Sequence, residues 1–84
     1  MTSGIEVPGV TPAIVVANDD PQGMFRVKLR LPWMGDDFQT DWARIVLPYG
    51  AAPAYPEIGD EVLVAFERGD VRYPYVLGRL TTRS

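Results

Sequence analysis

Hydrophobic and polar positions along the chain form five short apolar segments separated by clusters of turn-forming residues. The clearest pattern lies at 25–31, where Phe25, Val27, Leu29 and Leu31 alternate with arginine and lysine. A period of two residues is typical of a β-strand with one face on the core and the other in water. The five segments predict five strands, at 12–17, 25–31, 40–47, 61–66 and 75–80.

The connections between these segments carry strong turn chemistry. The connection at 18–23 contains an Asp-Pro pair and a glycine, and 48–56 contains three prolines and a glycine, so both are predicted to be loops. Tight turns are predicted at 57–60 and 68–70. Gly78, inside the last apolar segment, predicts a β-bulge or a close approach of another backbone.

The number and spacing of the segments predict an all-β fold. No window of helical period competes with them, and five strands within about 70 residues fit a five-stranded OB-fold Greek-key barrel. An SH3-like barrel has the same number of strands, so the pattern leaves both barrels open. Apolar residues lie on both sides of 40–47, which predicts a strand that is covered on both faces.

The composition narrows the classes of function. The chain has 84 residues, 8 Lys and Arg against 11 Asp and Glu, a net charge of −3, and neither cysteine nor histidine. The commonest general base, the commonest zinc ligand and the thiolate nucleophile are therefore missing, and we expect no enzyme activity, no metal and no cofactor. No apolar run approaches the ~20 residues of a membrane span, and residues 1–9 lack a signal-peptide pattern, so we expect no membrane anchoring.

Carboxylates are the only plentiful reactive groups, and four of them form two adjacent pairs, Asp19 with Asp20 and Asp36 with Asp37. An acid and base pair or a calcium site is the alternative to consider, but the spacing matches no EF-hand loop. Carboxylates in turns ordinarily accept hydrogen bonds from nearby backbone N–H groups. We predict that their loops, 18–23 and 35–40, lie at the barrel ends, where they are candidate docking loops.

A cationic row on the second predicted strand offers a different function. Arg26, Lys28 and Arg30 share the polar face of this strand. OB-folds bind single-stranded nucleic acid on that part of the barrel, with basic side chains and aromatic platforms. Nucleic-acid binding is therefore the alternative hypothesis, although the cations can equally pair with acidic residues on neighbouring strands, namely Asp41, Glu61 or Glu67.

The aromatic residues are more numerous than so small a core easily buries. A chain of this size leaves a thin core, so a partner or self-association is a reasonable expectation. Aromatic side chains and arginine are enriched at protein interfaces. The candidate interface residues are Trp33, Phe38, Trp42, Tyr73 and Tyr75.

Several segments, in order, resemble one known family. The segments are 12–16, 18–23, 26–33, 41–46, 56–67, 68–70 and 72–78. Together they closely resemble the OB domain of phage baseplate assembly protein V and of VgrG spike proteins. The resemblance covers about 10–80, which predicts an OB-fold domain at 10–80 with tails at 1–9 and 81–84.

The resemblance implies a structural role in a contractile injection apparatus. Family members form a trimer that joins the tail hub to a membrane-piercing β-helical spike, in phage tails and related secretion systems. It therefore implies a homotrimer with hub and spike partners and no nucleic acid. The implied location is the virion tail or an assembled injection particle made in the bacterial cytoplasm.

The sequence departs from the family pattern at three places. The family usually has Gly-Arg-Val where this chain has Met24-Phe25 before Arg26, so we expect a different turn there. The connection between Leu47 and Glu57 is shorter than the family's glycine-rich loop. Family members usually continue into a triple-stranded β-helix, for which the resemblance finds no counterpart in this sequence.

Overall fold

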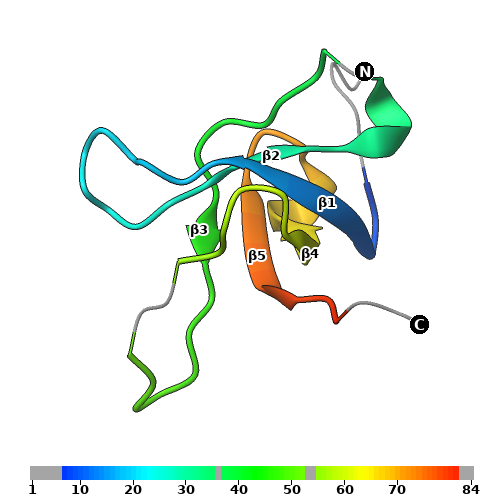
Figure 1. Ribbon diagram of the computed structural model, residues 1–84. Helices are drawn as coiled ribbons and strands as arrows, with labels where there is room; N and C mark the ends of the chain where they lie inside the picture. Colours follow the sequence, from blue (N-terminus) through cyan, green and yellow to red (C-terminus); the bar gives the residue numbers. More distant parts are fainter. Residues whose placement is uncertain (1–6, 36, 53–54, 82–84) are drawn as a thin grey trace.

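The structure, a computed structural model, describes residues 7–35, 37–52 and 55–81 (Figure 1). These residues form five strands and two short 3₁₀ helices. The strands are β1 (Val10–Ala17), β2 (Lys28–Arg30), β3 (Arg44–Ile45), β4 (Glu61–Phe66) and β5 (Pro74–Arg79), and the 3₁₀ helices are η1 (Pro32–Met34) and η2 (Glu67–Gly69). The all-β prediction is confirmed, although β2 and β3 are much shorter than predicted.

The strands form one sheet in the order β2-β1-β4-β5-β3. β1 runs antiparallel to both β2 and β4, β4 runs antiparallel to β5, and β3 runs parallel to β5. Val27 and Ala43, just before β2 and β3, join the two ends of this order. The Val27 N–H donates to the Ala43 carbonyl at 3.0 Å, and the Ala43 N–H donates to the Val27 carbonyl at 2.6 Å. This closing pair turns the sheet into a small Greek-key barrel, the OB fold.

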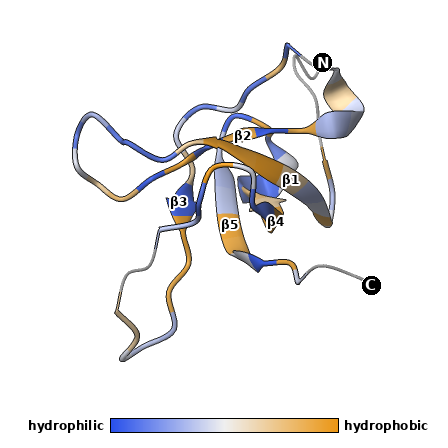
Figure 2. Ribbon diagram, viewed as in Figure 1, coloured by the Kyte–Doolittle hydropathy of each residue, from blue (hydrophilic) through white to orange (hydrophobic). Residues whose placement is uncertain are grey.

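The core lies inside the barrel and is built by the period-two pattern. Val27, Leu29 and Leu31 are fully buried, as predicted, and they meet Val15 of β1 and Val64 of β4. Figure 2 shows the hydrophobic stretch of β1 crossing the sheet. Successive side chains of a strand point to opposite faces of the sheet. Because one face contacts the core and the other contacts water, apolar and polar residues alternate along the sequence.

Two predictions about strand coverage are wrong. Phe25, the first residue of the alternating pattern, is 55% exposed and has a φ of 58°, so the strand begins after it. In the third segment Ala43 is buried, but Val46 and Leu47 are exposed in this single chain. The Val46 N–H still donates to the Val76 carbonyl of β5 at 2.9 Å, and beyond it the backbone extends away from the barrel (Figure 1). Within the described residues this segment is therefore not covered on both faces.

The turn predicted between β4 and β5 and the bulge predicted in β5 are both present in the structure. The turn closes through the Asp70 N–H, which donates to the Glu67 carbonyl at 2.9 Å. In the pairing of β4 with β5, Leu63 lies opposite Gly78 and Val64 opposite Val76, so Leu77 is the extra residue of a bulge. The bulge predicted at Gly78 is confirmed, and open space around this glycine excludes a close backbone approach as its cause.

Candidate interaction groove

A groove of about 780 Å³ lies on one side of the barrel. Its walls come from the β1–β2 loop, from β3 with its flanking residues, from Tyr55 and from the turn between β4 and β5. Aromatic rings line much of it, namely Phe25, Trp42, Tyr55, Tyr73 and Tyr75. In OB folds the loops after strands 1 and 4, together with the face of strands 2 and 3, form the usual ligand-binding side.

The β1–β2 loop is held by the buried carboxylate of Asp20. This carboxylate accepts hydrogen bonds from the backbone N–H groups of Gln22, Met24 and Arg26 at 3.0, 3.2 and 3.3 Å. It also accepts two from the Arg26 guanidinium, at 2.7 Å from Nε and 3.1 Å from Nη2. The hydrogen bond from Arg26 is the main reason that the pKa of Asp20 lies well below its usual range, against an opposing effect of burial. The two charges fix the loop and neutralise each other.

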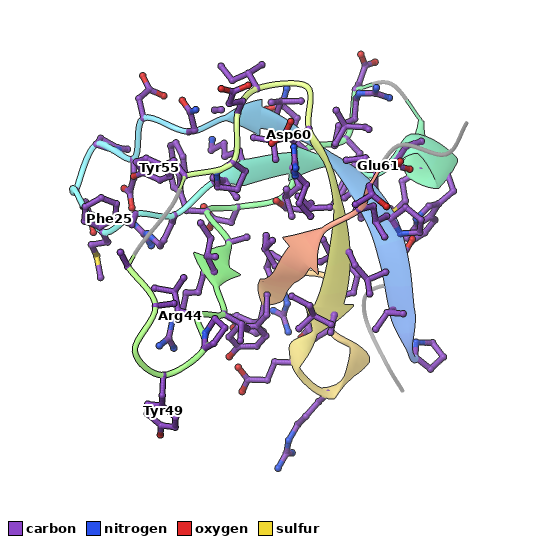
Figure 3. The ribbon with its side chains drawn as sticks, turned by 60° about the horizontal axis from the view of Figure 1, so that its bottom comes forward. Phe25, Arg44, Tyr49, Tyr55, Asp60 and Glu61 are labelled. Carbon is purple, nitrogen blue, oxygen red and sulfur yellow. The ribbon has the colours of Figure 1, made fainter. Side chains whose placement is uncertain are left out.

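Phe25 lies at the tip of this fixed loop and faces the other side of the groove (Figure 3). Its ring centroid is 5.2 Å from that of Tyr55, with the two planes tilted by 42°. A positive φ is unusual for a bulky residue with a Cβ atom. The changed turn expected at Met24-Phe25 is found as a phenylalanine in a backbone conformation that glycine adopts without strain.

The turn between β4 and β5 contributes a second internal ion pair. Arg72 Nη2 lies 2.6 Å from Asp70 Oδ2. Hydrogen bonds from the Arg72 side chain are the largest cause of the lowered pKa of Asp70, which is about 2. The same guanidinium lies 5.4 Å from the centroid of the Tyr73 ring. Arg72 therefore presents a cation that is already paired and stacked.

Tyr75 of β5 forms the floor between these two loops. Its hydroxyl donates to Glu67 Oε1 at 2.6 Å, and this hydrogen bond is the main reason that its pKa is raised. The Arg44 guanidinium lies 6.0 Å from the centroid of the Tyr75 ring. Figure 3 shows Arg44 on the same side of the molecule as Phe25 and Tyr55.

Two of the three cations predicted to share a face, Lys28 and Arg30, lie two residues apart on β2, and the third, Arg26, lies in the loop before it. Arg26 pairs with Asp20 of its own loop and not with a neighbouring strand. Lys28 Nζ lies 5.3 Å from the centroid of the Trp42 ring, and Arg30 pairs through its backbone with Gln39 across an isolated bridge. Binding of nucleic acid by these three cations stays a prediction.

Three of the five candidate interface residues lie in the groove, and the other two lie elsewhere. Trp42, Tyr73 and Tyr75 meet in the groove. Phe38 packs against the core, and Trp33 lies on η1, where its Nε1 donates to Thr11 Oγ1 at 2.8 Å. The sequence analysis did not select Phe25, Tyr55 or Arg44. The departure from the family pattern at Met24-Phe25 was the available signal for the first of these.

The candidate docking residues also differ in exposure. Asp19 and Asp37 are exposed, whereas the Asp20 side chain is buried and has no free face to offer a partner. Asp36 lies outside the described residues. Docking through these loops stays a prediction, and Asp19 and Asp37 are the two of its four carboxylates that the structure describes as exposed.

Residues 7–35, 37–52 and 55–81 hold neither a metal-binding cluster nor a membrane-spanning helix. In these ranges no three acidic side chains lie close enough to share a metal ion. No helix in the same ranges has the length and hydropathy needed to cross a membrane.

Comparison with known proteins extends the similarity to named relatives. Residues 11–80 match the family described as the type VI secretion system/phage-baseplate injector OB domain. Over 62 residues, 64% of this chain, the sequence is 39% identical to the type VI secretion system spike proteins VgrG2a and VgrG2b of Pseudomonas aeruginosa. The matched segment is only 7% and 6% of the length of these two relatives.

Proposed function

The chain belongs to the family of type VI secretion system/phage-baseplate injector OB domains, and from this membership we propose that it is the collar that links a hub to a membrane-piercing spike. The family is one of structural domains of baseplates and spikes. The single observation that carries the proposal is that the match spans 11–80 and thus the whole barrel, from β1 to the end of β5.

The proposed mechanism is mechanical, with no catalysed reaction and no cofactor. A barrel closed by the Val27–Ala43 pair transmits load between its two ends, and its loops provide the contacts. The partners would be further copies of the chain in a homotrimer, a hub or baseplate protein and a β-helical spike or tip. The location would be a virion tail or an assembled injection particle, made in the bacterial cytoplasm.

The arrangement of charges favours this role over binding of single-stranded nucleic acid. The net charge is −3, and Arg26 and Arg72 are each paired with a carboxylate. A binder of the phosphate backbone needs cations that can release its counterions. In a fluorescence titration at low salt, we expect no binding of a single-stranded oligonucleotide at tens of micromolar.

Co-purification with a hub protein tests the proposed function. The full chain, tagged and co-expressed with the hub and spike proteins of its own apparatus, should be recovered with the hub through gel filtration. Asp19→Lys combined with Asp37→Lys should reduce this recovery, because both carboxylates are exposed in the predicted docking loops. Glu57→Lys, an exposed site outside those loops, is the control. No recovery of the hub with the unaltered chain would contradict the collar role.

A further inference from the structure

An uncharged arm extends from the barrel directly after β3. We define the arm as residues 46–52; no charged residue occurs between Arg44 and Glu57. Val46 and Leu47 are 49% and 42% exposed, and Tyr49 is 108% exposed. Figure 3 shows Tyr49 pointing away from the barrel at the end of the arm. Three exposed apolar side chains within four residues make this segment a candidate interaction site.

The groove beside the arm has the complementary character. Aromatic and aliphatic side chains line much of it, and its charged side chains are engaged within the chain. Arg26 and Arg72 are paired with Asp20 and Asp70. Arg44 lies 6.0 Å from the centroid of the Tyr75 ring, whose hydroxyl donates to Glu67, and Asp41 accepts a hydrogen bond from the Trp42 N–H. A phosphate polymer or an acidic peptide would have to compete with these carboxylates for the guanidinium groups. An uncharged segment with an aromatic side chain would not.

Phe25 gives an independent reason to regard the groove as a binding site. Its ring is half-exposed, so it contributes little to the core, and its φ of 58° disfavours any side chain. Strained residues of this kind persist where the surrounding structure holds them and where the conformation serves a function. Here the Asp20 hydrogen bonds hold the loop, and the result is a phenyl ring displayed at the edge of the groove.

We propose that the groove binds the arm of a second copy of this chain, with Tyr49 as the anchor and Phe25 as its main contact. Within one chain the Tyr49 ring makes almost no contact, since it is fully exposed. The arm carries no charge that would need a partner in the groove, and its binding would leave the ion pairs of Arg26 and Arg72 in place. The inference rests on the proposed function, because a collar of several copies needs such a contact between subunits.

Sedimentation of the full chain from about 1 to about 500 μM tests the contact. We expect a reversible rise in mass with concentration. Phe25→Ala and Tyr49→Ala should each weaken this self-association at least about tenfold, as expected for central interface residues. Ile58→Ala removes an exposed apolar side chain outside both the arm and the groove and should leave the association unchanged. Circular dichroism checks that every variant is folded.

Mixing the two variants provides the sharper test. The Phe25→Ala chain keeps an intact arm, and the Tyr49→Ala chain keeps an intact groove. An equimolar mixture should therefore form a heterodimer at concentrations where each variant alone is monomeric. A monomeric parent chain at every concentration, or an association that neither substitution weakens, would overturn the inference. So would binding of a single-stranded oligonucleotide that Phe25→Ala abolishes.

The outcomes separate this inference from the proposed function. A chain that stays monomeric yet is recovered with its hub would reject only the contact between arm and groove. A chain that associates through Phe25 and Tyr49 yet recovers no hub would reject the collar role and leave this contact in place.

Discussion

At the scale of single residues, substitutions of Phe25 can distinguish the cost of its backbone conformation from the role of its ring. Its φ of 58° favours glycine over any residue with a Cβ atom. Phe25→Gly and Phe25→Ala both remove the ring, but only glycine relieves the backbone. We expect the glycine variant to be more stable than the alanine variant by about 1 kcal/mol in urea unfolding. Equal stabilities of the two variants would show that the loop carries no strain at this position.

Asp20 makes a prediction about acid stability. Its pKa in the folded chain is lowered, chiefly by the Arg26 hydrogen bond, so the unfolded chain takes up the proton first as the pH falls. The stabilisation is therefore complete above the unfolded pKa of about 3.9 and is lost at lower pH. Asp20→Asn should lower the thermal midpoint by several degrees at pH 7, and this difference from the parent should shrink below about pH 4.

Asp19 supplies the matched control for this experiment. It is the neighbouring residue with the same side chain, but it is exposed. Asp19→Asn should keep both the thermal midpoint of the parent chain and its acid profile. An equal loss in both variants would mean that net charge, and not the hydrogen bonds of the buried carboxylate, determines the stability of the loop.

At the scale of elements, the alternating pattern identified five strands in the correct order because burial of one face imposes a period of two. It overestimated β2 and β3 for a different reason. Hydropathy does not record where a backbone finds hydrogen-bonding partners, and around Val27 and Ala43 the pairing is a single bridge. The pattern also did not show that Phe25 turns away from the core, since one positive φ reverses the direction of a side chain without changing the hydropathy.

The groove was only partly predictable for a related reason. Trp42, Tyr73 and Tyr75 could be selected as surplus aromatic residues. Arg44 and Tyr55 belong to the site only because the fold brings β3 and the connection after it next to the β1–β2 loop. Pairing of Arg26 with Asp20, six residues away, is a local contact, but the sequence offered several carboxylates as equal partners.

Substitution of two glycines by alanine tests whether the turn before β4 and the bulge of β5 require glycine. Gly59 has a φ of 96° in the turn before β4, where the Asp60 N–H donates to the Glu57 carbonyl at 3.0 Å. Gly78, in the bulge of β5, has an ordinary φ and open space where a Cβ would lie. We expect Gly59→Ala to destabilise the chain by about 1 kcal/mol or more and Gly78→Ala to stabilise it by about 0.5 kcal/mol in urea unfolding. A loss of stability at Gly78 would mean that the bulge requires glycine.

At the scale of the whole molecule, the family relationship and the physics of the barrel agree. The resemblance drawn from the sequence is confirmed by the match over 11–80, and the segments with an apolar face pair in the order β2-β1-β4-β5-β3. The sequence pattern alone left the OB and SH3-like barrels open. The choice between them depended on the partners of β1 and on the closing pair, both of which are contacts between distant segments.

Closure by so short a contact has a measurable consequence for the whole barrel. Val27 and Ala43 are fully buried and exchange two backbone hydrogen bonds, so opening this contact would expose the core. We therefore expect the amide protons of Val27 and Ala43 to exchange with solvent only by global unfolding, with the same free energy and the same denaturant dependence as the amides of β4. Native-state hydrogen exchange followed by NMR measures both quantities, with the exposed Tyr49 as the reference for fast exchange.

If the amides of Val27 and Ala43 exchange more easily than those of β4, the barrel opens between β2 and β3 while the rest stays folded. A collar that opens in this way would bend under load, whereas one that exchanges as a single unit has the stiffness that transmission of force requires.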